Sequence, residues 1–473
     1  MGIKRIGGGM AVNQITEGVI WKQLLYFFFP ILFGTFFQQL YNTADAVIVG
    51  QFVGTQALAA VGGATGSLIN FFVNLFVGLA SGTTVVIAQA YGAHDAESVG
   101  GTVHTSVALA LAAGLGLTAV GVAAAPWALS AMGTPADIMD FALTYLRVYM
   151  LGTIPSFLYN VGSGILRAVG DTRRPLYFLI TACLVNIALD VVLVAVLGMG
   201  VLGAALATIL SQGVSAVLVL VSLTRAETVY RLDWKQVRFH GRLLGDILRV
   251  GVPAGLQSNM YAISNILIQT AINGFGTATV AAWTAHGKVD GFFWMILGAY
   301  GISITTFAGQ NFGAQKYDRI RRSVRVCLAL GFGSAVLMSV LYCSLAPYLL
   351  GLFTRDAEVV SIGLDMVRQL VPYYFTYVCI EILAGAARGC GCSLAPMLMT
   401  CGGVCVLRVA WIFILLPLRP ELSTVLVSYP ASWVFTSVLF IFYYLQGGWL
   451  RGRIRKMGYA PEERGRKKEA GAH

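Results

Sequence analysis

Long apolar segments dominate the chain, and short polar segments separate them. A helix needs about 20 apolar residues to cross the hydrocarbon core of a bilayer, and twelve segments are long enough. They span residues 20–48, 56–88, 99–125, 138–166, 175–197, 201–223, 247–273, 279–309, 323–350, 360–386, 396–416 and 422–446. The pattern predicts an all-α, polytopic membrane protein with twelve transmembrane helices.

The second half of the chain repeats the first at a separation of 221 residues. Ala-Gln-Ala-Tyr-Gly-Ala at 88–93 returns as Gly-Gln-Asn-Phe-Gly-Ala at 309–314. Leu-Arg-Ala-Val-Gly-Asp at 166–171 likewise corresponds to Ala-Arg-Gly-Cys-Gly-Cys at 387–392. Parallel repeats of this kind enclose a central cavity in many transporters. We therefore expect two six-helix lobes related by pseudo-twofold symmetry.

The repeat divides the chain into five parts. They are an N-terminal segment (1–18), an N-lobe (19–224), a linker (225–246), a C-lobe (247–447) and a basic tail (448–473). Lys and Arg gather after the fourth, sixth, eighth and twelfth apolar segments. Because basic loops stay on the cytoplasmic side, this bias predicts that both termini are cytoplasmic in a multi-pass inner cell membrane protein.

Composition supports this interpretation. The chain is 57% hydrophobic and 11% charged, with a mean hydropathy of +0.75, whereas a soluble protein carries about 25% charged residues. The net charge of +11 follows from the topology, together with contact with anionic lipid, and we expect no nucleic-acid partner.

Ionisable residues inside apolar segments are functional candidates, because a charge in the bilayer interior is costly. Asp45 shares a helix face with Tyr41, and Asp190 shares one with Asn186. With Thr208 on the next helix, these side chains form an oxygen-rich set that suits a small cation such as Na+. Two close carboxylates would equally suit a shared proton. Capping of broken helices by each Asp remains the structural alternative.

The acidic pair has no counterpart in the second lobe, where Trp411 stands at the position equivalent to Asp190. That lobe instead carries Glu381 and Arg408. They either pair with each other across adjacent helices or face a substrate. The candidate substrate cavity comprises Glu381, Arg408, Gln38, Gln257, Asn259 and Tyr377.

Pro30 lies inside the first apolar segment, fifteen residues before Asp45. A proline within a helix frees a carbonyl group and bends the helix. The bend is either linked to the charge of Asp45 or a fixed kink.

Motifs of other function classes are absent from the sequence. There is no Gly-Lys-Ser/Thr nucleotide motif and no Gly-x-Ser-x-Gly or His-Glu-x-x-His motif, which argues against an ATP-driven pump and against an enzyme. The histidines share no spacing, and we expect them at loops or helix ends. They are His94, His104, His240, His286 and His473.

The order of the motifs resembles that of the multidrug and toxic compound extrusion (MATE) transporters. The resemblance rests on Tyr41-Asn-x-x-Asp45, on the segments 88–93 and 166–171, and on Asn186-x-x-x-Asp190. It implies export of cationic and amphipathic organic compounds in exchange for Na+ or H+. Within this family, the motif pattern resembles that of the DinF-like branch, which implies a cation site in the N-lobe.

The resemblance to that branch implies that Asp45, Asn186, Asp190, Thr208 and Tyr41 of this chain bind the cation. It also implies that the first helix bends at Pro30. The NorM-like branch instead relies on acidic residues in helices seven and ten. Here the seventh segment has Gln257, Ser258 and Asn259 and no acid.

We therefore expect a monomeric, cation-coupled antiporter for small organic molecules that is in contact with membrane lipid and needs no cofactor beyond its coupling ion. A flippase for a lipid-linked saccharide is the first alternative. It would need a basic cavity, and Arg147, Arg388 and Arg408 are the few deep basic residues. A sensor or scaffold without transport is the second.

Overall fold

The computed structural model describes residues 15–354 and 356–458, and within these ranges the chain is helical with no strand. Most of the predicted N-terminal segment and the end of the basic tail lie outside the described residues. The first half contains α1 (Ile20–Phe52), α2 (Thr55–Gly62), α3 (Ala64–Gly92), α4 (Ala96–Ala131), α5 (Met139–Leu151), α6 (Thr153–Ala168), α7 (Arg173–Asp190), the π-helix η1 (Val191–Val196) and α8 (Gly200–Thr224).

The short 3-10 helix η2 (Trp234–Gln236) lies in the connection to the second half. The second half contains α9 (Gly241–Asn273), α10 (Thr277–Gly313), α11 (Tyr317–Gly351), α12 (Ala357–Leu370), η3 (Val371–Tyr373), α13 (Tyr374–Gly389), α14 (Leu394–Thr400), the π-helix η4 (Cys401–Val406), α15 (Leu407–Leu415), α16 (Leu422–Gln446) and α17 (Gly448–Lys456).

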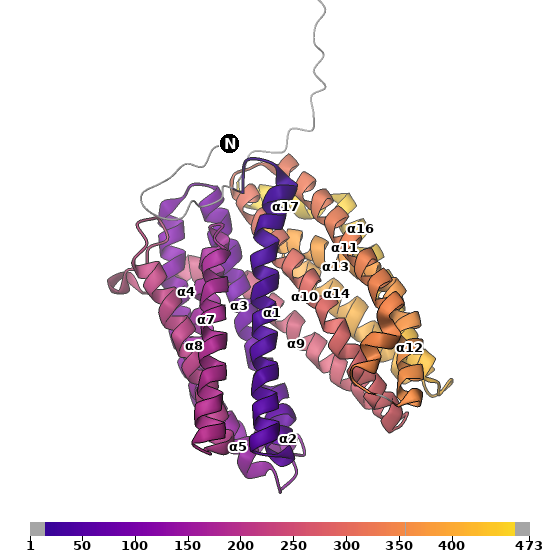
Figure 1. The fold of residues 1–473 in the computed structure, drawn as a ribbon. Coiled ribbons are helices and arrows are strands. Elements are labelled where there is room, and N and C mark those ends of the chain that lie inside the picture. Colours follow the sequence, from indigo (N-terminus) through magenta and orange to yellow (C-terminus); the bar gives the residue numbers. More distant parts are fainter. Residues whose placement is uncertain (1–14, 355, 459–473) are drawn as a thin grey trace, which may run out of the picture.

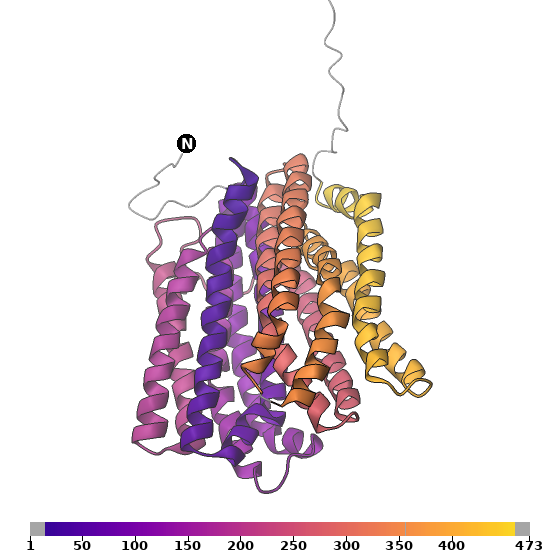
Figure 2. The same cartoon turned by 45° about the vertical axis from the view of Figure 1, so that its right-hand side comes forward.

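The two halves stand side by side as bundles of roughly parallel rods (Figures 1 and 2). In Figure 1 they lie close together where the chain begins and diverge toward the opposite end. We call the near end the basic end, because its connections carry most of the Arg and Lys residues. It comprises residues 15–18 and the chain that follows α3, α6, α8, α10, α13 and α16.

The prediction of a twelve-helix membrane protein is confirmed. Among the described residues, ten helices are long and apolar enough to cross a membrane, and the pair α5 and α6 makes eleven if it counts as one span. The twelfth is α9, whose 33 residues rise about 50 Å along a helix axis. Buried polar residues such as Gln257 and Asn259 interrupt its apolar sequence.

The fourth predicted segment, 138–166, is not one straight helix. It is broken at Gly152 into α5 and α6, which are bent by 47°. Gly152 is packed against α8, where a Cβ would lie 2.9 Å from Cβ of Ile209. Pro155 falls in the first turn of α6, where its missing N–H costs no helical hydrogen bond. The break therefore coincides with a close contact between Gly152 and α8 and with a proline in the turn that follows.

Apolar side chains cover the outside of both bundles. Trp127, Tyr348 and Leu352 are each at least 75% exposed. Such an exterior is stable only against lipid, which agrees with a membrane protein.

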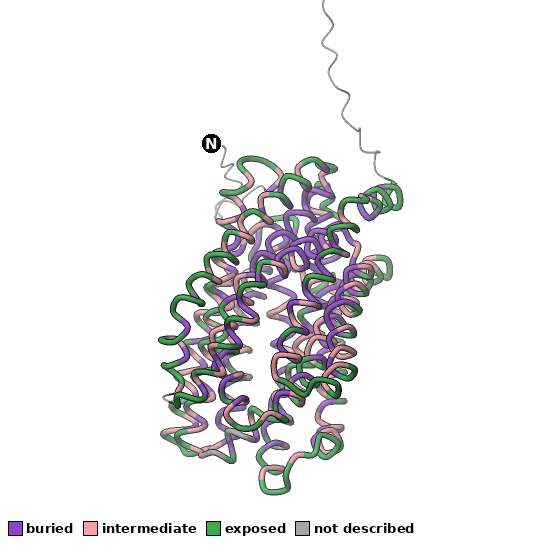
Figure 3. The backbone as a smooth tube through the Cα atoms, turned by 90° about the vertical axis from the view of Figure 1, so that its right-hand side faces the viewer, coloured by how far each residue is buried: buried purple, intermediate pink, exposed green. Residues whose placement is uncertain are grey.

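The most extensive contact between the lobes is that of α3 with α9. A Cβ on Gly78 or on Gly82 would lie 2.9 Å from backbone atoms of Gly251, so glycine is required at both positions. Buried positions also concentrate toward the basic end (Figure 3). The lobes are therefore joined tightly over one part of their length.

Candidate functional site

Three N-lobe helices bring the predicted cation ligands together. Asp45 lies on α1, Asn186 and Asp190 on α7, and Thr208 on α8, and these helices pack against one another. All four side chains are buried, and Asp190 is fully so. The carboxyl groups of Asp45 and Asp190 are close enough to interact electrostatically. Residues far apart in the sequence thus form one acidic cluster.

The cluster contains polar atoms without protein partners. Among the described residues, nothing donates to or accepts from Asp45 Oδ1, the side-chain amide of Asn186 or either oxygen of Asp190. A buried polar group without a hydrogen bond costs about 1–3 kcal/mol. Because five such atoms gather in one place, the cluster has the donors and acceptors to hold a cation, a proton or water.

Tyrosines and a glutamine surround the cluster, and sequence reasoning identified only Tyr41 of them. The hydroxyl of Tyr145 lies beside that of Thr208 and within electrostatic range of Asp45. Gln212 donates to the hydroxyl of Tyr149 at 3.5 Å. The signal that could have found Tyr145 and Tyr149 is their spacing of four residues, which places both on one helix face.

A small polar cavity adjoins the cluster. It has a volume of about 40 Å³, room for one water molecule or a few. Gln38 and Tyr41 from α1 and Gln212 from α8 line it, together with Ser156 and Asn160 of α6. Gln38, predicted as a cavity residue, therefore lies with the N-lobe site.

The backbone also changes at Asp190. The α-helix α7 ends there and continues as the π-helix η1, in which Leu197 N–H donates to the carbonyl of Val192 at 2.9 Å. Single turns of π-helix occur mostly inside α-helices and often at functional sites. In contrast, α1 runs unbroken through Pro30, so whether α1 bends there stays a prediction.

In the C-lobe, the first of the two alternatives for Glu381, a pair with Arg408, is wrong. Glu381 Oε1 lies 3.3 Å from Nη2 of Arg388, two turns further along α13. Arg408 is buried, donates from Nε and Nη2 to Ser432 Oγ at 3.2 and 3.0 Å, and lies 4.0 Å from the ring centre of Tyr429. Each charge is satisfied locally, so neither needs the other.

The remaining predicted cavity residues lie apart from the N-lobe cluster. The Tyr377 hydroxyl is 2.6 Å from that of Tyr261 on α9. Gln257 and Asn259, also on α9, are buried, and Asn259 Oδ1 has no hydrogen-bond partner among the described residues.

Asp290 is a C-lobe acid that sequence reasoning missed. It lies inside α10, where Oδ2 accepts a hydrogen bond from Trp294 Nε1 at 2.6 Å and Oδ1 accepts one from the Tyr374 hydroxyl. His286, one turn earlier, is buried with Nδ1 2.8 Å from the Tyr342 hydroxyl. The expectation that the histidines lie at loops or helix ends is therefore wrong here.

The repeated segments 88–93 and 309–314 join the lobes at the basic end. Gln89 Nε2 donates to the carbonyl of Gly389 at 2.7 Å, and Gln310 Nε2 donates to the carbonyl of Ala168 at 2.6 Å. Gln310 is 221 residues after Gln89, and Gly389 is 221 residues after Ala168. The two hydrogen bonds are therefore equivalent under the repeat, and we call them the paired latch.

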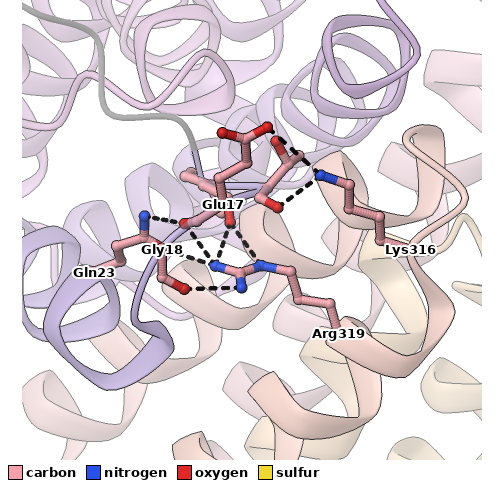
Figure 4. Close-up of polar contacts among 7 residues, drawn as sticks. Glu17, Gly18, Gln23, Lys316 and Arg319 are labelled. Carbon is pink, nitrogen blue, oxygen red and sulfur yellow. Dashed lines mark hydrogen bonds and ion pairs between the residues drawn. The ribbon is translucent and has the colours of Figure 1, made fainter. Parts of the chain in front are cut away.

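A second contact ties the start of the chain to the C-lobe (Figure 4). Arg319 on α11 donates to the carbonyls of Ile15, Glu17 and Gly18 and to Gln23 Oε1, at 2.8 to 3.2 Å. Lys316 Nζ donates to the carbonyl of Thr16 at 3.0 Å. Together with the paired latch, this clamp holds the lobes together at the basic end.

Comparisons with known proteins agree with the repeat. The MatE family pattern matches residues 30–192 and again residues 253–414, so one match falls in each lobe and the two cover more than half of the chain.

The chain is also similar to curated proteins over nearly its whole length. A probable multidrug resistance protein, YoeA of Bacillus subtilis, is 27% identical over 458 residues, which are 95% of this chain and 98% of that protein. A probable multidrug resistance protein, NorM of Thermotoga maritima, is 26% identical over 450 residues, 92% of this chain and 96% of that one.

Among solved structures, an outward-facing multidrug resistance MATE family transporter aligns with a TM-score of 0.86. It is 24% identical, and the alignment covers 92% of this chain and 97% of the other. At this identity the similarity shows a shared fold.

Proposed function

The chain belongs to the MatE family of transporters, and from that premise we propose that it is a cation-coupled antiporter. It exports organic, mostly cationic or amphipathic compounds by alternating access. Multidrug resistance is the property named for these relatives, and export coupled to a cation is our addition. The observation that carries it is the group of unpartnered oxygens at Asp45, Asn186 and Asp190.

The chemistry of the cluster suits either coupling ion. Na+ binds through oxygen ligands, which Asp45, Asn186, Asp190 and Thr208 can supply. A proton would be shared between the two carboxyl groups, because two close carboxylates in a dry site do not both stay ionised. In both cases one positive charge replaces the repulsion between the acids with attraction. Cation entry therefore draws α1 and α7 together.

The closed basic end supports alternating access. The paired latch and the Arg319 clamp join the lobes there, and a transporter that shares this fold has been solved in an outward-facing conformation. With both termini in the cytoplasm, as the basic loops favour, this state is closed to the cytoplasm. Release of the latch would open the opposite state, in which substrate enters from inside the cell.

The proposal is tested with proteoliposomes that hold a fluorescent organic cation. Efflux is followed first under an imposed Na+ gradient and then under an imposed pH gradient. Asp45→Asn and Asp190→Asn should each abolish gradient-driven efflux, because an amide neither carries the charge nor releases a proton. The control is Asp365→Asn, since Asp365 is an exposed surface residue. Wild-type efflux by Asp45→Asn would exclude the mechanism.

A flippase for lipid-linked saccharides is not favoured. It would need free basic groups in the cavity to bind phosphate. Arg388 is paired with Glu381, and Arg408 is held by Ser432 and Tyr429.

A further inference from the structure

A separate cavity of about 670 Å³ lies in the C-lobe at the basic end. Segments of α9, α14, α16 and α17 form it, and α17 begins after a turn at Gly447, which has φ of 63°. The walls are mostly apolar and include Val252, Leu394, Tyr443 and Trp449. Val252 and Leu394 are 45% and 58% exposed, so the walls continue onto the surface that faces lipid.

Three basic residues stand around this cavity: Arg249, Arg453 and Lys456. Arg453 is only 9% exposed, and its Nε donates to the carbonyl of Cys390 at 3.2 Å. A Cβ on Gly391 would lie 2.8 Å from both Nε and Nη2 of Arg453. Glycine at this position therefore leaves room for the guanidinium at the edge of the cavity.

The positive charges are not balanced by protein. In the part of the chain that the structure describes, no carboxylate forms an ion pair with Arg249, Arg453 or Lys456. All three nevertheless lie within electrostatic range of one atom, the Cys392 sulfur. A nearly buried arginine with two further cations beside it is costly unless an anion joins them.

We propose that the cavity binds an anionic phospholipid. The phosphate contacts Arg249, Arg453 and Lys456, and an acyl chain lies along Val252 and Leu394. Basic pockets between transmembrane helices suit such head groups. The apolar walls favour a lipid over a soluble anion, because a soluble anion would leave them in contact with water.

The test is lipid binding by the full-length chain, purified in detergent and measured by native mass spectrometry. Dioleoylphosphatidylglycerol is titrated against dioleoylphosphatidylcholine. The double variant Arg249→Gln, Lys456→Gln removes the two exposed cations and leaves Arg453 in place. Each basic residue near an anionic lipid contributes enough for the pair to weaken phosphatidylglycerol binding by roughly 30-fold.

The matched control is Arg451→Gln, Arg455→Gln. It removes the same charge from exposed residues of α17 that do not line the cavity. The control should bind phosphatidylglycerol as the wild type does. Equal binding of the two lipids by the wild type would overturn the proposal, as would equal losses in the two double variants. Displacement of the lipid by millimolar inorganic phosphate would show that the ligand is a soluble anion.

Discussion

Replacing Gly313 with alanine is expected to push the lobes apart at the basic end. A Cβ at this position would lie 2.8 Å from the carbonyl carbon of Gln89 and 3.0 Å from the nitrogen of Ala93. Both are backbone atoms of the other lobe, so no side chain can rotate to make room. The neighbouring hydrogen bond from Gln310 to Ala168, 2.6 Å long, must lengthen as the lobes separate.

The size of the effect follows from these distances. Carbon atoms pack at about 3.5–4.0 Å, and the carbonyl oxygen of Gln89 lies nearer to this Cβ than either atom above. The helices must therefore separate by roughly 1 Å or more. Such overpacking typically costs about 1–3 kcal/mol. If that cost destabilises only the conformation with a closed basic end, the population of this conformation falls about 5- to 150-fold relative to the conformation with an open basic end.

The assay is the distance between spin labels on Glu97 and Arg322, which are exposed residues of the two lobes near the basic end. Gly313→Ala should move the distribution to longer distances. The control is Gly298→Ala in the same helix, where a Cβ would meet nothing within 4 Å. This control makes the same change from glycine to alanine, with its gain in helix propensity, but creates no contact with the other lobe. Identical distance distributions for the two variants would refute the reasoning.

Three further variants probe separate contacts. Arg319→Gln removes charged donors to the carbonyls of residues 15–18, so the same labels should report a longer distance, from a loss of about 1–2 kcal/mol. Asp290→Asn replaces one of two acceptor oxygens with an NH2 donor, so one of the hydrogen bonds from Trp294 and Tyr374 is lost. It should lower the thermal unfolding temperature in detergent by a few degrees, from about 1–3 kcal/mol; an unchanged temperature would contradict this. Arg408→Lys keeps the charge but loses the planar donor pair to Ser432 and should be destabilised by a similar amount; wild-type stability would count against it.

The fold could be predicted from the sequence because the bilayer imposes strong constraints. Apolar length gives the number of helices, and the 221-residue repeat gives the two lobes. The break at Gly152 could not be located in the same way, since hydropathy is uniform across it. It depends on contact with Ile209, which is distant in the sequence.

The candidate site was predicted only where charge stands out against apolar neighbours. Asp45 and Asp190 follow from that rule, although the sequence alone does not show that they meet. Asp290 lies inside the predicted apolar segment 279–309 and was still not singled out. Its hydrogen bonds to Trp294 and Tyr374 join it to residues that the sequence does not pair with it. The alternative that paired Glu381 with Arg408 overlooked a nearer cation. Arg388 lies seven residues along the same helix, and a spacing of two turns returns to one face.

The paired latch has a consequence for how such a chain could arise. Each repeat presents one glutamine and one carbonyl and receives the equivalent pair from the other repeat. This is the self-complementary geometry of a twofold dimer of identical subunits. A polypeptide of half this length could form both hydrogen bonds by pairing with its own copy. Fusion of two genes would then need no new contact at this junction, and each half would afterwards be free to change its buried charges.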